Sequence, residues 1–196
     1  MTGIVLSGGE SRRMGTDKAF LKLFGIPLIE HALRTLRDIC DHLIIVTNEP
    51  ERYAAYKAVV VTDAFDIPGP LTGIYSGLLR SMDESNVIVA CDMPFLNQQL
   101  IFSMAGLAEG YDIVVPKIQG RVEPLHAIYQ RRLLPIIENR IKQDTRQIQA
   151  LFNEARVRYV TEEEIDRFDP RRRSFMNLNT PQEYKEATCL DLECRS

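Results

Sequence analysis

The sequence predicts a single-domain α/β protein whose mostly parallel sheet is covered by helices on both faces. Three observations point to this architecture. Short apolar runs alternate with segments that carry apolar residues at helical spacing, the connections are short, and glycine-rich stretches follow two of the runs. The 196 residues are enough for one sizeable core, and a hydrophobic fraction of 45% is ordinary for a globular protein.

The first half of the chain alternates most clearly. Residues 3–7 (GIVLS) form the first expected strand, and residues 27–39 follow as an amphipathic helix. The continuous apolar run at 42–47 (HLIIVT) suits a parallel strand buried on both faces. The pattern then predicts a short helix near 52–56, strands at 58–62, at 86–96 with a closing turn, and at 111–117, and helices at 69–82 and 98–109.

The second half is less regular. A strand is expected at 126–130 and another at 156–161, with helices at 131–143, 146–154 and 181–187, and a poorly ordered tail at 188–196. In a parallel sheet the strand ends fall on one edge. We therefore expect Leu6, Val46, Val61 and Ala90 to lie near the carboxyl ends of neighbouring strands.

Composition excludes several classes of protein. A formal net charge of -3 gives no support to a nucleic-acid partner. No apolar run approaches the roughly 20 residues of a membrane span, and no signal peptide is recognisable, so we expect a cytoplasmic protein without a membrane partner. The scattered cysteines and histidines indicate free thiols rather than a zinc site: Cys40, Cys91, Cys189, Cys194, His31, His42 and His126.

The loop behind the first strand has the ingredients of an anion site. It matches neither the Walker A pattern, since Thr16 and not lysine follows Gly15, nor the dinucleotide fingerprint, since Gly8 and Gly9 are adjacent. Paired glycines let backbone N–H groups approach a phosphate. Arg12, Arg13 and Lys18 add positive charge, although a surface loop with solvated arginines is the alternative.

Specific motifs carry a resemblance to a known family. Residues 6–21 (LSGGESRRMGTDKAFL) resemble the signature L-x-G-G-x-S-x-R-M-G-x-D-K of nucleotidyltransferases that handle molybdenum cofactor and of their sugar-nucleotide relatives. Over almost the whole chain, four further stretches resemble the molybdenum cofactor guanylyltransferases, the MobA family: PGPLTGI at 68–74, CDMPFL at 91–96, EPLHAIY at 123–129 and NLNTPQEY at 177–184.

The resemblance implies a Rossmann-like fold of the nucleotide-diphospho-sugar transferase type. It implies transfer of GMP from GTP to the terminal phosphate of molybdenum-molybdopterin, with release of pyrophosphate. Residues 1–110 would form the GTP-binding half and 111–187 the acceptor half. The attacking phosphate is already ionised at neutral pH and needs no general base. Such an enzyme must align two anions and neutralise the developing charge.

Site residues follow from the matched motifs. The resemblance places Lys18 over the triphosphate and the backbone of Leu6, Ser7, Gly8 and Gly9 against the base and phosphates. Asp63 matches a nucleotide-binding position, with a helix or turn cap as the alternative. Asp92 ends a strand as an exposed carboxylate placed to hold Mg²⁺ at the α-phosphate, with an acidic turn residue as the alternative.

Other positions are left open. Gly69 and Gly73 should bring a helix N-terminus to the ligand, or serve only capping and packing. Asn177, Asn179 and Thr180 resemble an acceptor-binding segment, although Thr180 could equally cap a helix. Val46 stands where some family members have an asparagine, so Thr47 or Asn48 would replace that base contact. Arg171, Arg172 and Arg173 form a solvated loop or attract the pterin phosphate.

Three alternatives to guanylyl transfer remain open at this point. They are cytidylyl transfer to the same cofactor, nucleotidyl transfer to a sugar phosphate, and a carrier without enzymatic activity. The expected partners are GTP and molybdenum-molybdopterin as substrates, with molybdoenzyme apoproteins or cofactor-delivery proteins as further partners and the monomer as the favoured state.

Overall fold

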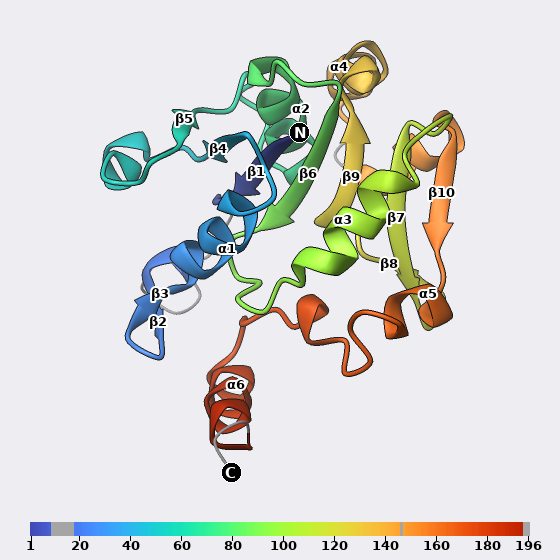
Figure 1. Ribbon diagram of the computed structural model, residues 1–196. Helices are drawn as coiled ribbons and strands as arrows, with labels where there is room; N and C mark the ends of the chain where they lie inside the picture. The colour runs from blue at the N-terminus through green and yellow to red at the C-terminus, as the bar shows by residue number, and fades with distance from the viewer. Residues whose placement is uncertain (9–17, 146, 194–196) are drawn as a thin grey trace.

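The computed structural model describes residues 1–8, 18–145 and 147–193, and an eight-stranded sheet forms its centre (Figure 1). The order across the sheet is β10-β7-β9-β6-β1-β4-β5, and β8 pairs with β7. The strands are β1 (Thr2–Leu6), β4 (His42–Val46), β5 (Val59–Val61), β6 (Ser85–Ala90), β7 (Ile113–Ile118), β8 (Arg121–Val122), β9 (His126–Gln130) and β10 (Val157–Val160).

The register of the sheet confirms the predicted alignment of strand ends. Leu6 pairs with Val46 of β4 and Ala90 of β6, and Val46 pairs with Val61 of β5, all in parallel pairs. Strand β9 runs antiparallel to both β6 and β7, so the sheet is mixed but mostly parallel, as expected. Four neighbouring carboxyl ends therefore share one edge, where open α/β sheets bind their ligands.

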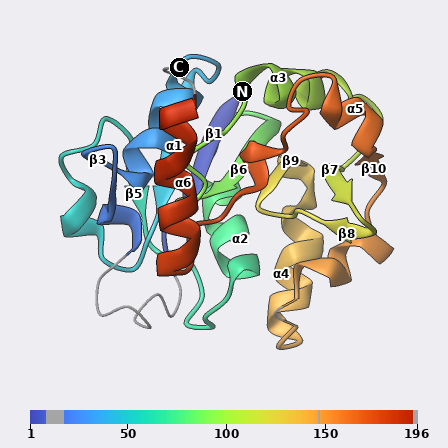
Figure 2. The ribbon, with the colours of Figure 1, turned by 90° about the horizontal axis from the view of Figure 1, so that it is seen from below.

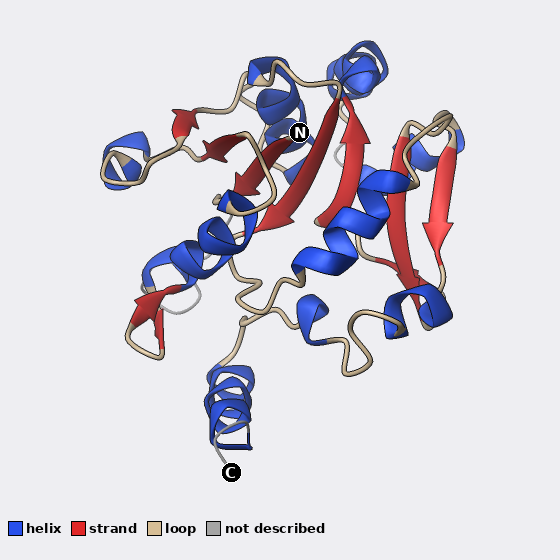
Figure 3. Cartoon of the chain, in the orientation of Figure 1, coloured by secondary structure: helices blue, strands red, loops and turns tan. Residues whose placement is uncertain are grey.

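Helices cover both faces of the sheet (Figure 3). Alternating strand residues point to opposite faces. Val5 and Ile45 belong to a buried cluster with α1 and α3, while Ile4 and Ile44 belong to a second cluster with α2 and α4. The helices are α1 (Leu28–Arg37), α2 (Pro70–Arg80), α3 (Gln98–Gly106), α4 (Leu134–Lys142), α5 (Glu162–Asp166) and α6 (Pro181–Glu193).

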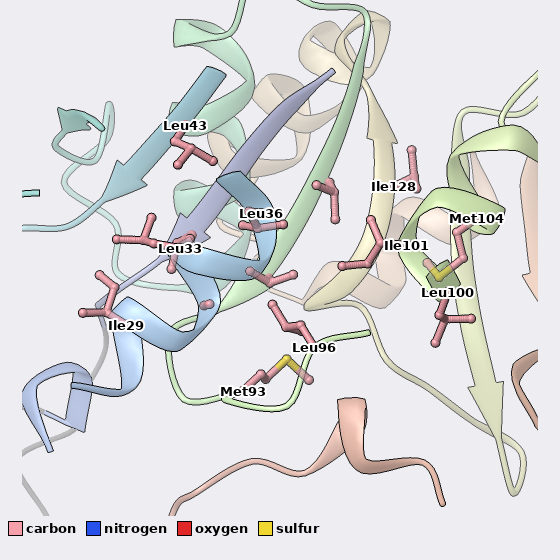
Figure 4. Packing of buried hydrophobic residues seen from close by; sticks show 14 of the residues in the cluster. Ile29, Leu33, Leu36, Leu43, Met93, Leu96, Leu100, Ile101, Met104 and Ile128 are labelled. Atoms are coloured by element: carbon pink, nitrogen blue, oxygen red, sulfur yellow. The ribbon is translucent and has the colours of Figure 1, made fainter. Parts of the chain in front are cut away.

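The cluster that includes α1 and α3 extends across the strands on one face of the sheet. Figure 4 shows apolar side chains of α1 and α3 over the strands, with Met93 and Leu96 from the turn after β6 lying between the two helices. All of these side chains are at most 8% exposed. The turn that follows β6 is thus anchored in the core, which fixes the neighbouring residues of the strand end.

Helix α2 approaches the sheet closely at Gly77. A Cβ atom added there would lie 2.6 Å from Cγ2 of Ile4, closer than any unstrained contact. Glycine is therefore required for the depth at which α2 sits on β1. That depth also sets the position of the amino end of α2, which points to the edge of the sheet where the strands end.

Some local elements differ from the sequence-based expectation. A small hairpin joins β2 (Lys22–Leu23) to β3 (Ile26–Pro27), because Phe24 and Gly25 take positive φ values of 52° and 79°. The segments expected as helices near 52–56 and 146–154 form the 3-10 turns η3 (Pro50–Tyr53) and η5 (Ile148–Asn153). Short helices lack the propagation gain that stabilises longer ones.

The C-terminal part of the chain packs against residues that closely follow the glycine-rich motif in the sequence. After α5 the turn η6 (Arg173–Phe175) leads to a segment that passes below the sheet in Figure 1, and α6 contacts β2. Seen from below, α6 lies in front of α1 (Figure 2). Ala187 of α6 packs with Leu23 and Leu28. Helix α6 continues to Glu193, so part of the tail expected to be poorly ordered is helical. No helix in the described ranges has the length and apolarity that a membrane crossing requires.

Candidate active site

A cavity of about 860 Å³ lies where the strands end, a size typical of small-molecule sites. It is built from the ends of β1, β4 and β6, the amino end of α2, the segment before β9 and the segment before α6. The lining residues are Leu6, Gly8, Lys18, Val46, Thr47, Asn48, Asp63, Pro68, Gly69, Pro70, Gly73, Ala90, Cys91, Asp92, Met93, Glu123, Pro124, Leu125, Asn177, Asn179 and Thr180.

Most residues singled out in the sequence meet in this cavity. Leu6, Gly8, Lys18, Asp63 and Asp92 line it, together with the three polar residues of the segment before α6. The predicted contributions of Gly9, Arg12 and Arg13 fall outside the described residues.

Lys18 connects the early motif to the end of the chain. It begins the 3-10 turn η2 (Lys18–Phe20), and its Nζ donates a hydrogen bond to Oδ1 of Asn179, 161 positions later. The charges of Asp92 and Glu183 also lie close enough to interact with it. The ammonium group is therefore held over the cavity by a side chain from the segment expected to bind the acceptor.

Asp92 is less exposed than the sequence suggested. The sequence predicted an exposed carboxylate, but it is half-buried, and its main-chain oxygen accepts a hydrogen bond of 3.0 Å from the Leu178 N–H. Burial raises the pKa of Asp92, while the charge of Lys18 lowers it. A partly dehydrated carboxylate with one ammonium group nearby is incompletely neutralised, so a further cation would stabilise it.

The donor set tests which metal would fit. Among the described residues no three His, Cys, Asp or Glu side chains come together as a protein-built metal site. One carboxylate suits Mg²⁺, which keeps several waters and binds through one or two carboxylates and substrate phosphates. Asp92, one of three carboxylates in the described lining and the one beside Lys18, could hold it in this way.

Asn48 and Asp63 form a reciprocal pair at the β4–β5 end of the cavity. The Asn48 amide donates to Asp63 Oδ2 at 3.0 Å, and the Asp63 N–H donates to Asn48 Oδ1 at 3.4 Å. Burial raises the pKa of Asp63, and the Asn48 hydrogen bond lowers it. Thr47 is buried, and its hydroxyl accepts a bond of 3.2 Å from the Glu49 N–H. Of the two residues that could replace the contact absent at Val46, Asn48 has the exposed side chain.

Ser7 supports the glycine loop but does not line the cavity. Its hydroxyl and that of Tyr53 are hydrogen-bonded at 2.7 Å in the interior, and its N–H donates to the Val46 oxygen at 2.8 Å. Tyr53, in η3, was missed in the sequence because nothing in its local pattern links it to the loop. This pair holds the beginning of the loop to the core.

The amino end of α2 faces the cavity as expected. Gly69 precedes the helix with φ 154° and ψ 158°, a conformation essentially restricted to glycine, and no side chain caps the helix there. Pro70 occupies the first turn, and Gly73 lines the cavity. Uncapped N–H groups and the helix dipole make this turn suitable for a phosphate.

The arginine cluster does not line the cavity. Arg172 donates to both carboxylate oxygens of Asp166, at 2.8 and 2.9 Å, and also to Glu162, so it braces α5. The nearby His126 is completely buried. Burial lowers the pKa of His126 to about 4, although the charge of Asp169 raises it, so the imidazole is neutral at physiological pH.

Comparisons with known proteins identify the family. A family model described as the MobA-like NTP transferase domain matches residues 3–160. The chain belongs to this family. The predicted family and fold class are thereby confirmed.

Individual members of the MobA-like family extend the likeness over nearly the whole chain. A molybdenum cofactor guanylyltransferase of Desulfosudis oleivorans is 42% identical over 189 residues, covering 95% of this chain and 94% of that protein. A probable molybdenum cofactor guanylyltransferase of Natranaerobius thermophilus is 35% identical over 193 residues, covering 95% and 94%.

Solved structures agree with this placement. The molybdopterin-guanine dinucleotide biosynthesis protein A of Archaeoglobus fulgidus superimposes with a TM-score of 0.87 at 29% identity, covering 98% of this chain and 100% of that chain. The 2-C-methyl-D-erythritol 4-phosphate cytidylyltransferase of Thermus thermophilus reaches 0.70 at 17% identity, with 96% and 97% covered, which shows a shared fold alone.

Proposed function

We propose that the chain transfers GMP from GTP to the terminal phosphate of molybdenum-molybdopterin, releasing pyrophosphate and forming molybdopterin guanine dinucleotide. The observation that carries this proposal is the meeting of Lys18, Asp92 and Asn179 in one cavity that Gly8 also lines. The 42% identity to a molybdenum cofactor guanylyltransferase supports the choice of nucleotide and acceptor.

The two substrates would enter from opposite ends of the cavity. GTP would occupy the β1–β4–β5 side, against the backbone at Leu6 and Gly8, which Ser7 holds to the core, and against the Asn48–Asp63 pair and the first turn of α2. The acceptor would occupy the side formed by Asn177, Asn179 and Thr180. The α-phosphate then lies near Asp92, between residues 1–110 that bind the nucleotide and 111–187 that bind the acceptor.

The charges along the cavity explain how these residues would act. Among the described lining residues, three carboxylates (Asp63, Asp92 and Glu123) are accompanied by one ammonium group, that of Lys18. Two anionic substrates in such a cavity need further positive charge. Mg²⁺ held by Asp92 would supply that charge at the transferring phosphate. Lys18 would hold the phosphates in line, and the ionised acceptor phosphate would attack without a general base.

The competing functions are less well supported. A carrier has no need of an ammonium group and a dehydrated carboxylate facing one phosphate position, so we favour catalysis over pure carriage. Cytidylyl transfer and sugar-phosphate chemistry keep the same fold and differ only in what the cavity ends bind. We also propose that the protein works as a cytoplasmic monomer and passes its product to delivery proteins or apoenzymes.

The decisive experiment incubates the purified protein with molybdenum-molybdopterin, Mg²⁺ and GTP, CTP or UTP in separate reactions. We expect pyrophosphate and a dinucleotide from GTP alone. A cytidine dinucleotide would establish the cytidylyl alternative. Turnover only when a sugar phosphate replaces the cofactor would establish the second alternative, and cofactor binding without pyrophosphate release would establish a carrier.

A further inference from the structure

Glu123 occupies the end of the cavity that lies farthest across the sheet from Asp63. It precedes β9, whereas Asp63 follows β5, and the strand order β9-β6-β1-β4-β5 puts four strand spacings between them. At about 4.8 Å per spacing, this is a separation of roughly 19 Å. A nucleotide base held near Asp63 is therefore at the opposite end from Glu123.

The backbone around Glu123 is rigidly held. Its N–H donates to the Pro116 oxygen at 3.0 Å, and its own oxygen accepts from the His126 N–H at 3.1 Å. The Leu125 oxygen accepts from the Ala90 N–H at 3.2 Å, which ties this segment to the end of β6. A side chain on such a base is positioned before any ligand arrives, as a specificity contact requires.

The described residues leave the Glu123 carboxylate without a hydrogen-bond donor. It is half-buried in the cavity wall, and no described residue donates a hydrogen bond to it or forms an ion pair with it. Burial raises the pKa of Glu123, and the more distant charge of Arg121 lowers it. A partly dehydrated carboxylate without donors is costly unless a ligand supplies them.

Asp92 follows β6 and Glu123 precedes β9, so the two carboxylates belong to neighbouring strand ends. The described residues contain no cluster of three or more potential metal ligands. Burial raises the pKa of both carboxylates, but the nearby charges differ: Lys18 lowers the pKa of Asp92 and Glu183 raises it, whereas Arg121 lowers the pKa of Glu123. The two carboxylates therefore have different charged neighbours.

We propose that Glu123 is a specificity residue that accepts paired hydrogen bonds from the 2-amino group and the adjacent ring N–H of the acceptor's pterin. This inference rests on the proposed function. A pterin presents those two donors side by side, as a guanidinium does, and a carboxylate accepts such a pair in two parallel bonds. Guanine presents the same edge, so the test must separate pterin from GTP.

The first test measures binding without turnover. The probes are 6-hydroxymethylpterin phosphate and its lumazine counterpart, in which oxygen replaces the 2-amino group, followed by their intrinsic fluorescence. We expect the wild-type protein to prefer the pterin by roughly 10- to 100-fold, the scale of a charge-assisted pair of hydrogen bonds. Glu123→Gln, whose amide can donate to the lumazine oxygen, should reduce this preference to about threefold or less.

The matched control is Glu109→Gln, an exposed carboxylate outside the cavity, which should keep the wild-type preference. A merely structural role of Glu123 would weaken both probes together and leave their ratio unchanged. An unchanged ratio in Glu123→Gln, or no pterin preference in the wild-type protein, overturns the proposal.

The second test separates pterin from guanine. Calorimetric GTP affinity of Glu123→Gln should stay within about twofold, while KM for the acceptor in guanylyl transfer rises roughly 10- to 100-fold at little changed kcat. A GTP affinity that falls as much as the acceptor affinity overturns the assignment to pterin. Absence of dinucleotide from the wild-type protein would refute the proposed function instead, and the probe ratio would still report on Glu123.

Discussion

The two ends of the cavity are built by different means. At the β1–β4–β5 end, parallel strands present their carboxyl ends in register, and the uncapped first turn of α2 faces the cavity. At the β9 end the strand runs the other way, and the Glu123 side chain comes from the segment that precedes it. Backbone contacts survive most substitutions, whereas side-chain contacts do not. Nucleotide binding should therefore be robust to mutation, and acceptor binding should be sensitive.

Asp92 lies where the two ends meet, and its replacement should have the largest effect. Asp92→Asn should keep much of the GTP affinity, because the loop amides and Lys18 remain. Transfer should fall by roughly 10²- to 10³-fold, the scale of losing one preorganised charge at the transferring phosphorus. Raising Mg²⁺ or substituting Mn²⁺ should recover part of the rate, because an amide oxygen is a weaker ligand.

The measurement for Asp92 is the transfer rate against metal concentration for both proteins, alongside GTP binding. Equal rates and an unchanged metal requirement would show that Asp92 is only a turn residue. An equal loss of GTP affinity would show that Asp92 belongs to the nucleotide end of the cavity and not to the point where the two ends meet.

Lys18 should rank second. Lys18→Ala should lower guanylyl transfer by roughly 100-fold while the fold survives, because the side chain is partly exposed and packs in no cluster. Asn179→Ala should cost roughly tenfold, since it releases the ammonium group from the acceptor side. If Asn179 acts through Lys18, the double variant will be no slower than Lys18→Ala; additive losses would show that Asn179 contacts the acceptor independently.

Parts of this site could be predicted from the sequence, and parts could not. The alignment of Leu6, Val46, Val61 and Ala90 follows from the alternation of strands and helices, because parallel strands place their ends together. The contact between Lys18 and Asn179 depends on where the chain returns after 161 positions, which no local pattern encodes. The same applies to the Ser7–Tyr53 hydroxyl pair.

The burial of individual side chains in the site also could not be predicted from the sequence. Asp92 was expected to be exposed because it ends a strand. In the structure it is half-buried, and the Leu178 N–H donates a hydrogen bond to its main-chain oxygen. Glu123 was part of a recognised segment, yet its proposed role depends on its position in the cavity wall, where no residue of the described ranges donates to its carboxylate. In both cases the missing information is the environment of a side chain, which tertiary packing decides.

The close packing of α2 on β1 at the nucleotide end can be tested by measuring the free energy of unfolding. Gly77→Ala should destabilise the protein by about 1–3 kcal/mol, because the new Cβ meets Ile4 at 2.6 Å and the helix must shift. GTP affinity should fall with it, since the first turn of α2 moves. Gly106→Ala at the end of α3, where an added Cβ meets nothing within 4 Å, is the matched control. Denaturant melts that show equal stability for both variants would contradict the close packing.

The smallest effect should come from Asp112, which joins β7, β9 and β10 at the edge of the sheet opposite the cavity. Burial raises the pKa of Asp112, but hydrogen bonds from the Arg156 N–H at 2.8 Å and from Arg132 Nε at 2.6 Å outweigh it and bring the pKa to about 2. A carboxyl group with a lowered folded-state pKa contributes stability above its unfolded pKa and loses it as pH falls through the folded value. Asp112→Asn should therefore cost about 1–2 kcal/mol at pH 7, and the difference from wild type should shrink between about pH 4 and pH 2. Urea titrations of both proteins across this range measure it, and a difference independent of pH would show that packing, rather than charge, holds this edge together.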